Sequence, residues 1–223
     1  VEAGDHILVA STGRFAHGWA EMAKNLGVNA KIIEFGKQSP VDVEVVEETL
    51  RADTQKEFKA LLTTHVDTST SVKNDVAALR QALDASGHPA LLATDCIASL
   101  GCDDFQMDSW GVDVMVAGCQ KGLMVPPGLS FVYFSERAKK MQKMLSRVSS
   151  YWNWAPRIEP SGYYEYFCGT APTNHIYGLR KALDMILSEG IGAVLARHKA
   201  LAEAVWTAVE HWGHNGGLLK MNV

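Results

Sequence analysis

Cysteine is scarce in this chain of 223 residues, and its four positions fit no metal-binding or disulfide pattern. No two cysteines form a CxxC pair, and their spacing matches none of the usual zinc motifs. Histidines at HxH or HxxxH spacing are also absent from the sequence. We therefore predict no metal site, and we expect four free thiols in a reducing cytoplasm, at Cys96, Cys102, Cys119 and Cys168.

Long apolar runs and an excess of basic charge are lacking as well. No apolar run approaches the roughly 18 residues that a membrane-spanning helix needs, so no membrane partner is predicted. The net charge is −4 and no stripe of Lys and Arg is visible, which argues against a nucleic-acid partner. With 47% apolar and 21% charged residues, the composition is that of a globular protein with a sizeable core.

Both ends of the chain resemble internal sequence. The first residues, Val1 to His6, include no initiator methionine and lead directly into an apolar run. The last residues, 218–223, look like a strand that is cut short. We therefore interpret the chain as a fragment of a longer protein.

Short apolar runs alternate with longer amphipathic stretches over most of the chain. Runs typical of buried strands occupy residues 6–10, 30–35, 60–64, 89–95, 112–117 and 129–134. Helical spacing is found over residues 15–26, 41–52, 72–86, 135–146, 174–189 and 193–212. Pro40 indicates the start of the second helix, and residues 149–169 are expected to form a long aromatic loop. This alternation predicts an α/β fold, in which a mostly parallel sheet is covered by helices on both faces.

Ligands of such sheets bind beyond the carboxyl ends of the strands. Lys121 lies in that position after the run 112–117, and it allows two interpretations. Most lysines are surface residues with a hydrated amine. However, Gly118 permits a tight approach, and residues 124–128 are apolar and rigid, unlike a solvated loop. A desolvated lysine is a nucleophile, so the pattern favours a buried, reactive amine.

Asp95 ends the apolar run 90–94 and also allows two interpretations. It can cap the start of a helix or pair with a nearby cation. It can also be a buried anion that faces a cationic ligand such as a protonated pyridine ring. A carboxylate in that place keeps the ring protonated, and the ring can then accept electrons from a carbanion.

The spacing of Asp95 and Lys121 and four further segments carry a family resemblance when they are taken in order along the chain. Lys121 lies 26 positions after Asp95 and directly behind Gln120. The other segments are Val9-Ala10-Ser11-Thr12-Gly13-Arg14-Phe15, Thr64-His65-Val66-Asp67-Thr68-Ser69-Thr70, Pro126-Pro127-Gly128 and Gly169-Thr170-Ala171-Pro172-Thr173. Together they resemble the class V aminotransferases that depend on pyridoxal 5'-phosphate (PLP). The alanine–glyoxylate and serine–glyoxylate members are the most similar.

The resemblance implies the catalytic and cofactor-binding residues. It implies that Lys121 forms a Schiff base with PLP, that Asp95 pairs with the pyridine nitrogen, and that Gln120 contacts the phosphate. It places Phe15 and Ile97 on the two faces of the ring, although an aromatic residue at a helix start can also be a plain core residue.

The same resemblance implies further contacts. Thr68 would hydrogen-bond the cofactor, and Thr170 would contact the phosphate of a neighbouring subunit in a homodimer. Three positions depart from the family pattern: Asp67 replaces a Glu, Phe167 replaces a Tyr, and Cys119 replaces a Ser. The change at position 167 removes a hydroxyl and with it one expected phosphate contact.

The resemblance further implies a fold and a reaction. The fold is the large domain of the type I PLP-dependent transferases over residues 1–170, followed by a helical connection and the start of a small C-terminal domain over residues 171–223. The reaction is transamination between a small amino acid, of the alanine or serine type, and a 2-oxo acid such as glyoxylate or pyruvate. The family's phosphate-binding loop and its substrate-binding arginine would lie outside the sequence.

Three alternatives stay open at this point. A cysteine desulfurase shares the scaffold, but it usually has histidines where this chain has Gln120 and Phe15. A pyridoxamine–pyruvate aminotransferase fits the same residues. The third alternative is a fragment without catalytic activity, which dimerises and binds the cofactor weakly.

Overall fold

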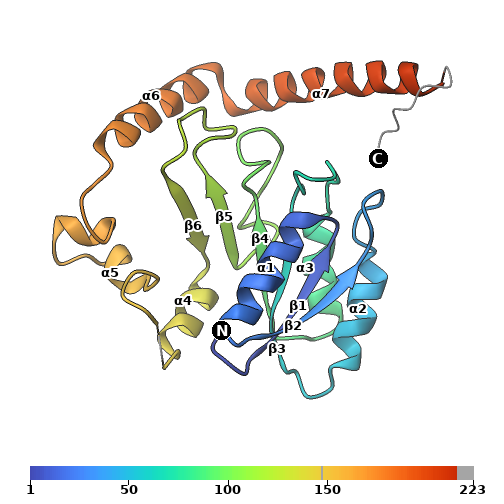
Figure 1. The fold of residues 1–223 in the computed structure, drawn as a ribbon, viewed down its shortest axis with the longest axis vertical. Helices are drawn as coiled ribbons and strands as arrows, with labels where there is room; N and C mark the ends of the chain where they lie inside the picture. The colour runs from blue at the N-terminus through green and yellow to red at the C-terminus, as the bar shows by residue number, and fades with distance from the viewer. Residues whose placement is uncertain (147, 215–223) are drawn as a thin grey trace.

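The computed structural model describes residues 1–146 and 148–214 (Figure 1). Six strands form one sheet: β1 (His6–Ser11), β2 (Asn29–Glu34), β3 (Phe58–Thr64), β4 (Leu91–Asp95), β5 (Val114–Gly118) and β6 (Ser130–Phe134). Their order in the sheet is β2-β1-β3-β4-β5-β6. Neighbouring strands are parallel except for β5 and β6, which are antiparallel. The predicted α/β fold with a mostly parallel sheet is therefore confirmed.

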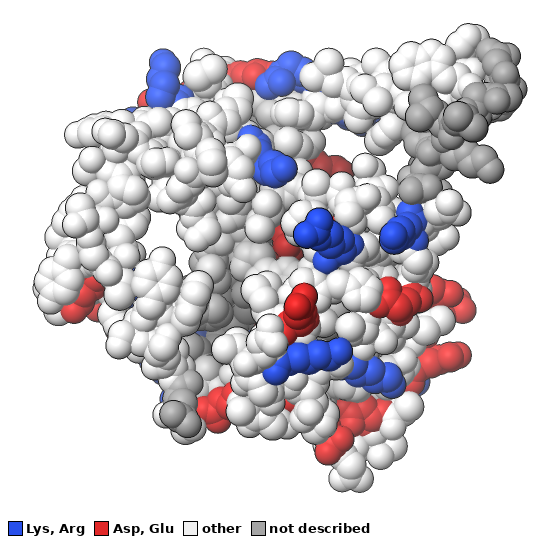
Figure 2. Space-filling model, in the orientation of Figure 1, with Lys and Arg blue, Asp and Glu red and all other residues white. Residues whose placement is uncertain are grey.

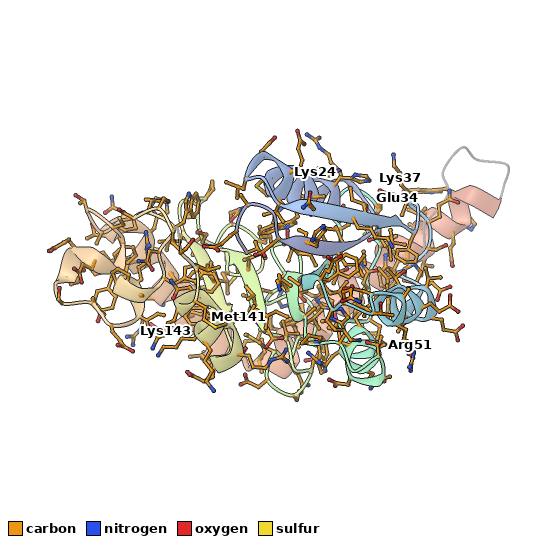
Figure 3. All side chains as sticks on the ribbon, turned by 90° about the horizontal axis from the view of Figure 1, so that it is seen from below. Lys24, Glu34, Lys37, Arg51, Met141 and Lys143 are labelled. Atoms are coloured by element: carbon orange, nitrogen blue, oxygen red, sulfur yellow. The ribbon has the colours of Figure 1, made fainter. Side chains whose placement is uncertain are left out.

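Helices cover both faces of the sheet. They are α1 (Arg14–Asn25), α2 (Val43–Ala52), α3 (Val76–Ala85), α4 (Glu136–Lys143), α5 (Ala155–Ile158), α6 (Thr173–Glu189) and α7 (Ile191–His214), with one 3₁₀ helix, η1 (Tyr163–Tyr166). Figure 3 shows Lys24 of α1 and Arg51 of α2 on opposite sides of the sheet. None of the described helices combines the length and apolar character that crossing a bilayer requires.

Strand β1 shows why the apolar runs are continuous rather than alternating. Ile7 and Val9 belong to the core beneath α1, together with Ala16 and Ala20 of that helix. Leu8 and Ala10 face the other way, into the larger core that α2 and α3 complete with Val46, Leu50, Leu79 and Leu83. Because both faces of the strand are buried, both sets of side chains are apolar.

The start of α2 differs from the prediction based on Pro40. The helix begins at Val43, because the side chain of Asp42 accepts the backbone N–H groups of Glu44 (3.0 Å) and Val45 (3.4 Å). A capping carboxylate of this kind fixes a helix start more firmly than a preceding proline.

The prediction of one long loop over residues 149–169 was wrong in part. The segment contains α5 and η1, which are each four residues long. The ring of Trp154, at the start of α5, stacks on Phe134 of the edge strand β6, with 4.8 Å between ring centroids. Such a long-range contact between aromatic rings stabilises a short helix, but it leaves no periodic pattern in the sequence.

Helices α6 and α7 form a bent arm across one end of the sheet (Figure 1). The arm packs on the segment that follows β5: Ala182 of α6 contacts the cluster of Cys119 and Val125, and Ile186 joins Leu123 and Val194. The fold thus supports the turn that carries Lys121. The strand expected over residues 218–223 lies outside the described residues.

Candidate active site

A cavity of about 320 Å³ opens beyond the carboxyl ends of the parallel strands. It is lined by Phe15, Val66, Thr68, Asp95, Ile97, Ala98, Gln120 and Lys121. Six of the seven site residues predicted from the sequence are therefore brought together, from the ends of β1, β3, β4 and β5. This is the position at which open α/β sheets bind their ligands.

Thr170, the seventh predicted residue, lies elsewhere. It is exposed and lines a second cavity of about 480 Å³ between β6 and the aromatic segment 151–167. Within one chain it therefore does not share a cavity with Lys121. The resemblance implies that Thr170 acts on a neighbouring subunit, and this stays a prediction.

The carboxylate of Asp95 is buried and held by two donors. The backbone N–H of Ile97 donates to Oδ1 (2.9 Å), and the indole Nε1–H of Trp19 donates to Oδ2 (2.9 Å). Asp95 ends β4 and is followed by a turn that leads to β5, so it starts no helix in the described chain. The geometry favours the reading of Asp95 as a buried anion over that of a helix cap.

Trp19 was missed as a site residue, because its spacing from Phe15 was interpreted only as part of a helix core. The same spacing contains the signal that could have identified it. Residues four apart lie on one face of a helix, so the face of α1 that brings Phe15 to the cavity also brings Trp19 towards it.

Lys121 lies in a tight turn after β5, and two glycines make that turn possible. A Cβ on Gly118 would lie 2.5 Å from Oε1 of Gln120, and a Cβ on Gly122 would lie 2.3 Å from the carbonyl oxygen of Leu100. The Leu100 backbone leaves no room for a side chain at Gly122, whereas a side chain at Gly118 would require the Gln120 side chain to move. The turn therefore fits against the loop after β4, which brings the lysine and Asp95 to the same cavity.

The expected burial of Lys121 is not found in the described chain. Its side chain is exposed at the cavity. The apolar stretch 124–128 does not cover it, because Val125 alone turns inward beneath α6, whereas Met124 and the residues at 126–128 face outward. The interpretation of Lys121 as a nucleophile therefore rests on its position in the cavity. Burial of the amine within this chain does not support it.

Phe15 is positioned by a carboxylate from another loop. The N-cap of α1 is Gly13, which has no side chain, and Asp67 takes over the capping role. The fully buried Asp67 accepts the backbone N–H groups of Phe15 (3.0 Å) and Ala16 (3.3 Å) through Oδ2. Through Oδ1 it accepts the N–H and the O–H of Ser69. The loop that carries Thr68 is thus tied to the helix that carries Phe15.

His65 lies behind the cavity rather than in its wall. Its Nδ1 lies 2.9 Å from Oγ of Ser99, and its ring contacts Phe105 and Trp110. Burial lowers the pKa of His65 to about 4 from an ordinary value of 6.5, so the imidazole is neutral at neutral pH. His65 therefore connects the loops that follow β3 and β4 without carrying charge.

Comparison with known proteins identifies the family. The sequence model of the family described as "Aminotransferase class-V" matches residues 1–215. The chain belongs to the class V aminotransferases.

Curated relatives of this class V aminotransferase act on different amino acids. The chain is 40% identical to the serine–glyoxylate aminotransferase of Methylorubrum extorquens and 41% identical to the L-aspartate–glyoxylate aminotransferase of Paracoccus denitrificans. Each alignment covers 94% of this chain and 53% of the relative, so the chain spans about half the length of these proteins.

A solved structure shows the same architecture. The alanine–glyoxylate aminotransferase from Nostoc sp. matches with a TM-score of 0.85 and 29% identity, over 96% of this chain and 56% of that one. The likeness extends to the type I fold of PLP-dependent transferases, as predicted.

Membership of the family implies pyridoxal 5'-phosphate as the cofactor, and the groups around the cavity fit it. A carboxylate has about four acceptor sites. Asp95 uses two of them on Ile97 and Trp19, so it can accept the N–H of a pyridinium ring. The cavity also presents an amine, an aromatic ring, an amide and a hydroxyl, at Lys121, Phe15, Gln120 and Thr68.

Proposed function

We propose that this protein is a PLP-dependent aminotransferase, which transfers the amino group of a small amino acid to a 2-oxo acid such as glyoxylate or pyruvate. The observation that carries the proposal is the meeting of Lys121 and Asp95 in one cavity, from the ends of the neighbouring strands β5 and β4. The glyoxylate-dependent relatives support the choice of acceptor. Because those relatives differ in their donors, the donor is named only as a small amino acid.

In the proposed mechanism, six of the eight residues that line the cavity have a defined task. The bound cofactor supplies a ring that stabilises negative charge on the substrate carbon. Lys121 would hold the cofactor through Nζ, and once the substrate amine displaces it, Nζ would act as the general base that removes the proton from Cα and as the acid that returns it. Asp95 keeps a proton on the ring nitrogen.

The other four of these residues orient the cofactor. Phe15 and Ile97 would confine the ring from its two faces, while Thr68 and Gln120 would bind its oxygen atoms. Their positions are fixed by the frame of α1, Asp67 and the glycine turn.

The role of Lys121 is tested by covalent trapping. The purified protein is titrated with PLP, reduced with borohydride and digested, and the peptides are weighed by mass spectrometry. We expect the cofactor on the peptide that contains Lys121, and we expect no trapping in Lys121→Ala. Lys24→Ala, which changes an exposed lysine at the far end of α1, is the matched control and should behave like the original protein.

Two outcomes would contradict this proposal. Trapping that persists in Lys121→Ala would exclude this residue as the attachment site. Absence of trapping at high PLP concentration would favour a fragment that does not hold the cofactor. Release of sulfide from cysteine would instead indicate a desulfurase.

We also propose that the protein is a cytoplasmic homodimer. The support for a dimer is the exposed aromatic surface beside Thr170, which includes Tyr151, Trp152, Tyr163, Tyr164 and Tyr166. The part of the molecule around α5 carries few charged side chains (Figure 2). Contiguous exposed apolar surface is typical of interaction sites. The four free cysteines support the reducing compartment.

A further inference from the structure

The indole of Trp19 lies outside the cavity wall but contacts the buried carboxylate of Asp95, which lines the cavity. Its Nε1–H donates to Oδ2 of Asp95 over 2.9 Å. An indole nitrogen can only donate, so the direction of this hydrogen bond is certain. The bond joins residues that are 76 positions apart in the chain, and through it helix α1 contacts the Asp95 carboxylate.

The contact completes the orientation of the Asp95 carboxylate. The Ile97 N–H alone fixes one oxygen and leaves the side chain free to rotate about that bond. With Trp19 on the second oxygen, the plane of the carboxylate is fixed. A carboxylate in a fixed plane presents its remaining acceptor sites in a constant direction, which is the requirement for pairing with one ring nitrogen.

Trp19 is itself held by the frame of the site. It lies one helical turn after Phe15, and the amide of Phe15 is bound by the buried Asp67. The same helix therefore positions the residue proposed to stack on the ring and the donor that orients the carboxylate. A shift of α1 would move both together.

We propose that Trp19 is a positioning residue for the cofactor, which acts through Asp95 by fixing the direction of its carboxylate towards the pyridine nitrogen. The proposal rests on the proposed function and adds a residue to the site. Removal of the indole donor leaves the cavity lining intact but releases one oxygen of Asp95. The cofactor then binds more weakly, and its ring nitrogen is protonated for a smaller fraction of the time.

The test is a double-mutant cycle with Trp19→Phe and Asp95→Asn. Loss of a hydrogen bond to a charged group typically corresponds to about a tenfold or greater change in an equilibrium constant. Because the bond is already present before PLP binds, this is an upper bound, and we expect Trp19→Phe to weaken PLP binding by up to about tenfold. In the Asp95→Asn background, the same substitution should have little further effect, because the residue through which it acts is already changed.

A second readout reports on the ring itself. With PLP labelled with ¹⁵N in the ring, Trp19→Phe should move the nitrogen resonance from the pyridinium range towards that of neutral pyridine. Trp206→Phe, at an exposed position of α7 that does not line the cavity, is the matched control and should change neither the affinity nor the resonance. Thermal unfolding confirms that each variant is folded.

The outcomes separate the two proposals. If the original protein traps PLP on Lys121 and Trp19→Phe has the same affinity and resonance, the role of Trp19 is refuted while the proposed function stands. An equal loss of affinity in both backgrounds would show that Trp19 acts by packing, and would also refute it. If the original protein traps no PLP, both proposals fail.

Discussion

At the scale of single residues, the buried neutral His65 makes the stability of the protein depend on pH. Its pKa is lowered to about 4 by burial, below the value of 6.5 in an unfolded chain. Between these values the unfolded chain binds a proton that the folded chain does not. The free energy of unfolding is therefore undiminished above pH 6.5 and falls as the pH decreases towards 4, by at most about 3 kcal/mol from this group.

Denaturant unfolding at pH 7, 5.5 and 4.5 measures this contribution. We expect His65→Gln to be less stable at pH 7, because the contact with Ser99 is altered, but to lose less stability than the original protein as the pH falls. Equal pH dependence in His65→Gln and the original protein would contradict the assignment to His65.

At the scale of structural elements, the turn after β5 tolerates no side chain at Gly122. In Gly122→Ala, the added Cβ would lie 2.3 Å from the Leu100 carbonyl oxygen, so the turn must move away from the loop after β4. We expect Lys121 to be displaced and the yield of trapped PLP to fall at least tenfold, since small misplacements of reacting groups have large effects.

Gly192→Ala is the control for that substitution. A Cβ at Gly192 meets no atom within 4 Å, and the residue lies in the first turn of α7, where alanine is compatible with the helix. This variant should trap PLP normally and be at least as stable as the original protein. Normal trapping in Gly122→Ala would show that the turn can relax without moving the lysine.

The elements themselves could be predicted well from the sequence. The strands were located to within two residues at each end, because runs that are buried on both faces are continuous and end at polar residues such as Ser11 and Asp95. The antiparallel direction of β6 was not specified, since apolar runs look the same in either direction. The connection from β5 to β6 contains no helix in the described chain, and a parallel crossover normally requires one.

Only those site residues whose side chains would react with or bind the cofactor directly could be predicted from the sequence. Lys121 and Asp95 were identified by their spacing, and the structure places them in one cavity. The groups that position Asp95 and Phe15 were not found, because they are defined by distance in space. Trp19 and Asp67 contact residues that lie 76 and 52 positions away in the chain, and no local pattern encodes such contacts.

At the scale of the whole molecule, Thr170 provides a test of the proposed dimer. If it completes the site of a neighbouring subunit, a mixture of Lys121→Ala and Thr170→Val should form hybrid dimers with one intact site. In a random mixture half of the dimers are hybrids, so about a quarter of the sites should recover. The amount of trapped PLP is measured at a cofactor concentration at which each variant, when it is alone in solution, traps little PLP.

The result depends on the subunits exchanging, so the two variants are refolded together and compared with a mixture that is combined after folding. Recovery after joint refolding alone would support a shared site. If joint refolding yields no recovery, Thr170 does not act across subunits, and its place beside the aromatic surface has another explanation.

The parallel order of the sheet also has a consequence for the time course of folding. The cavity is built from segments that begin at Phe15 and end at Lys121, so its walls come together only after four strands have paired. Contacts between residues so far apart in the chain form late, because the loops between them must close first. During refolding, the rate at which the cofactor attaches would therefore report when the sheet is complete. Circular dichroism from helices that form earlier would not report this step.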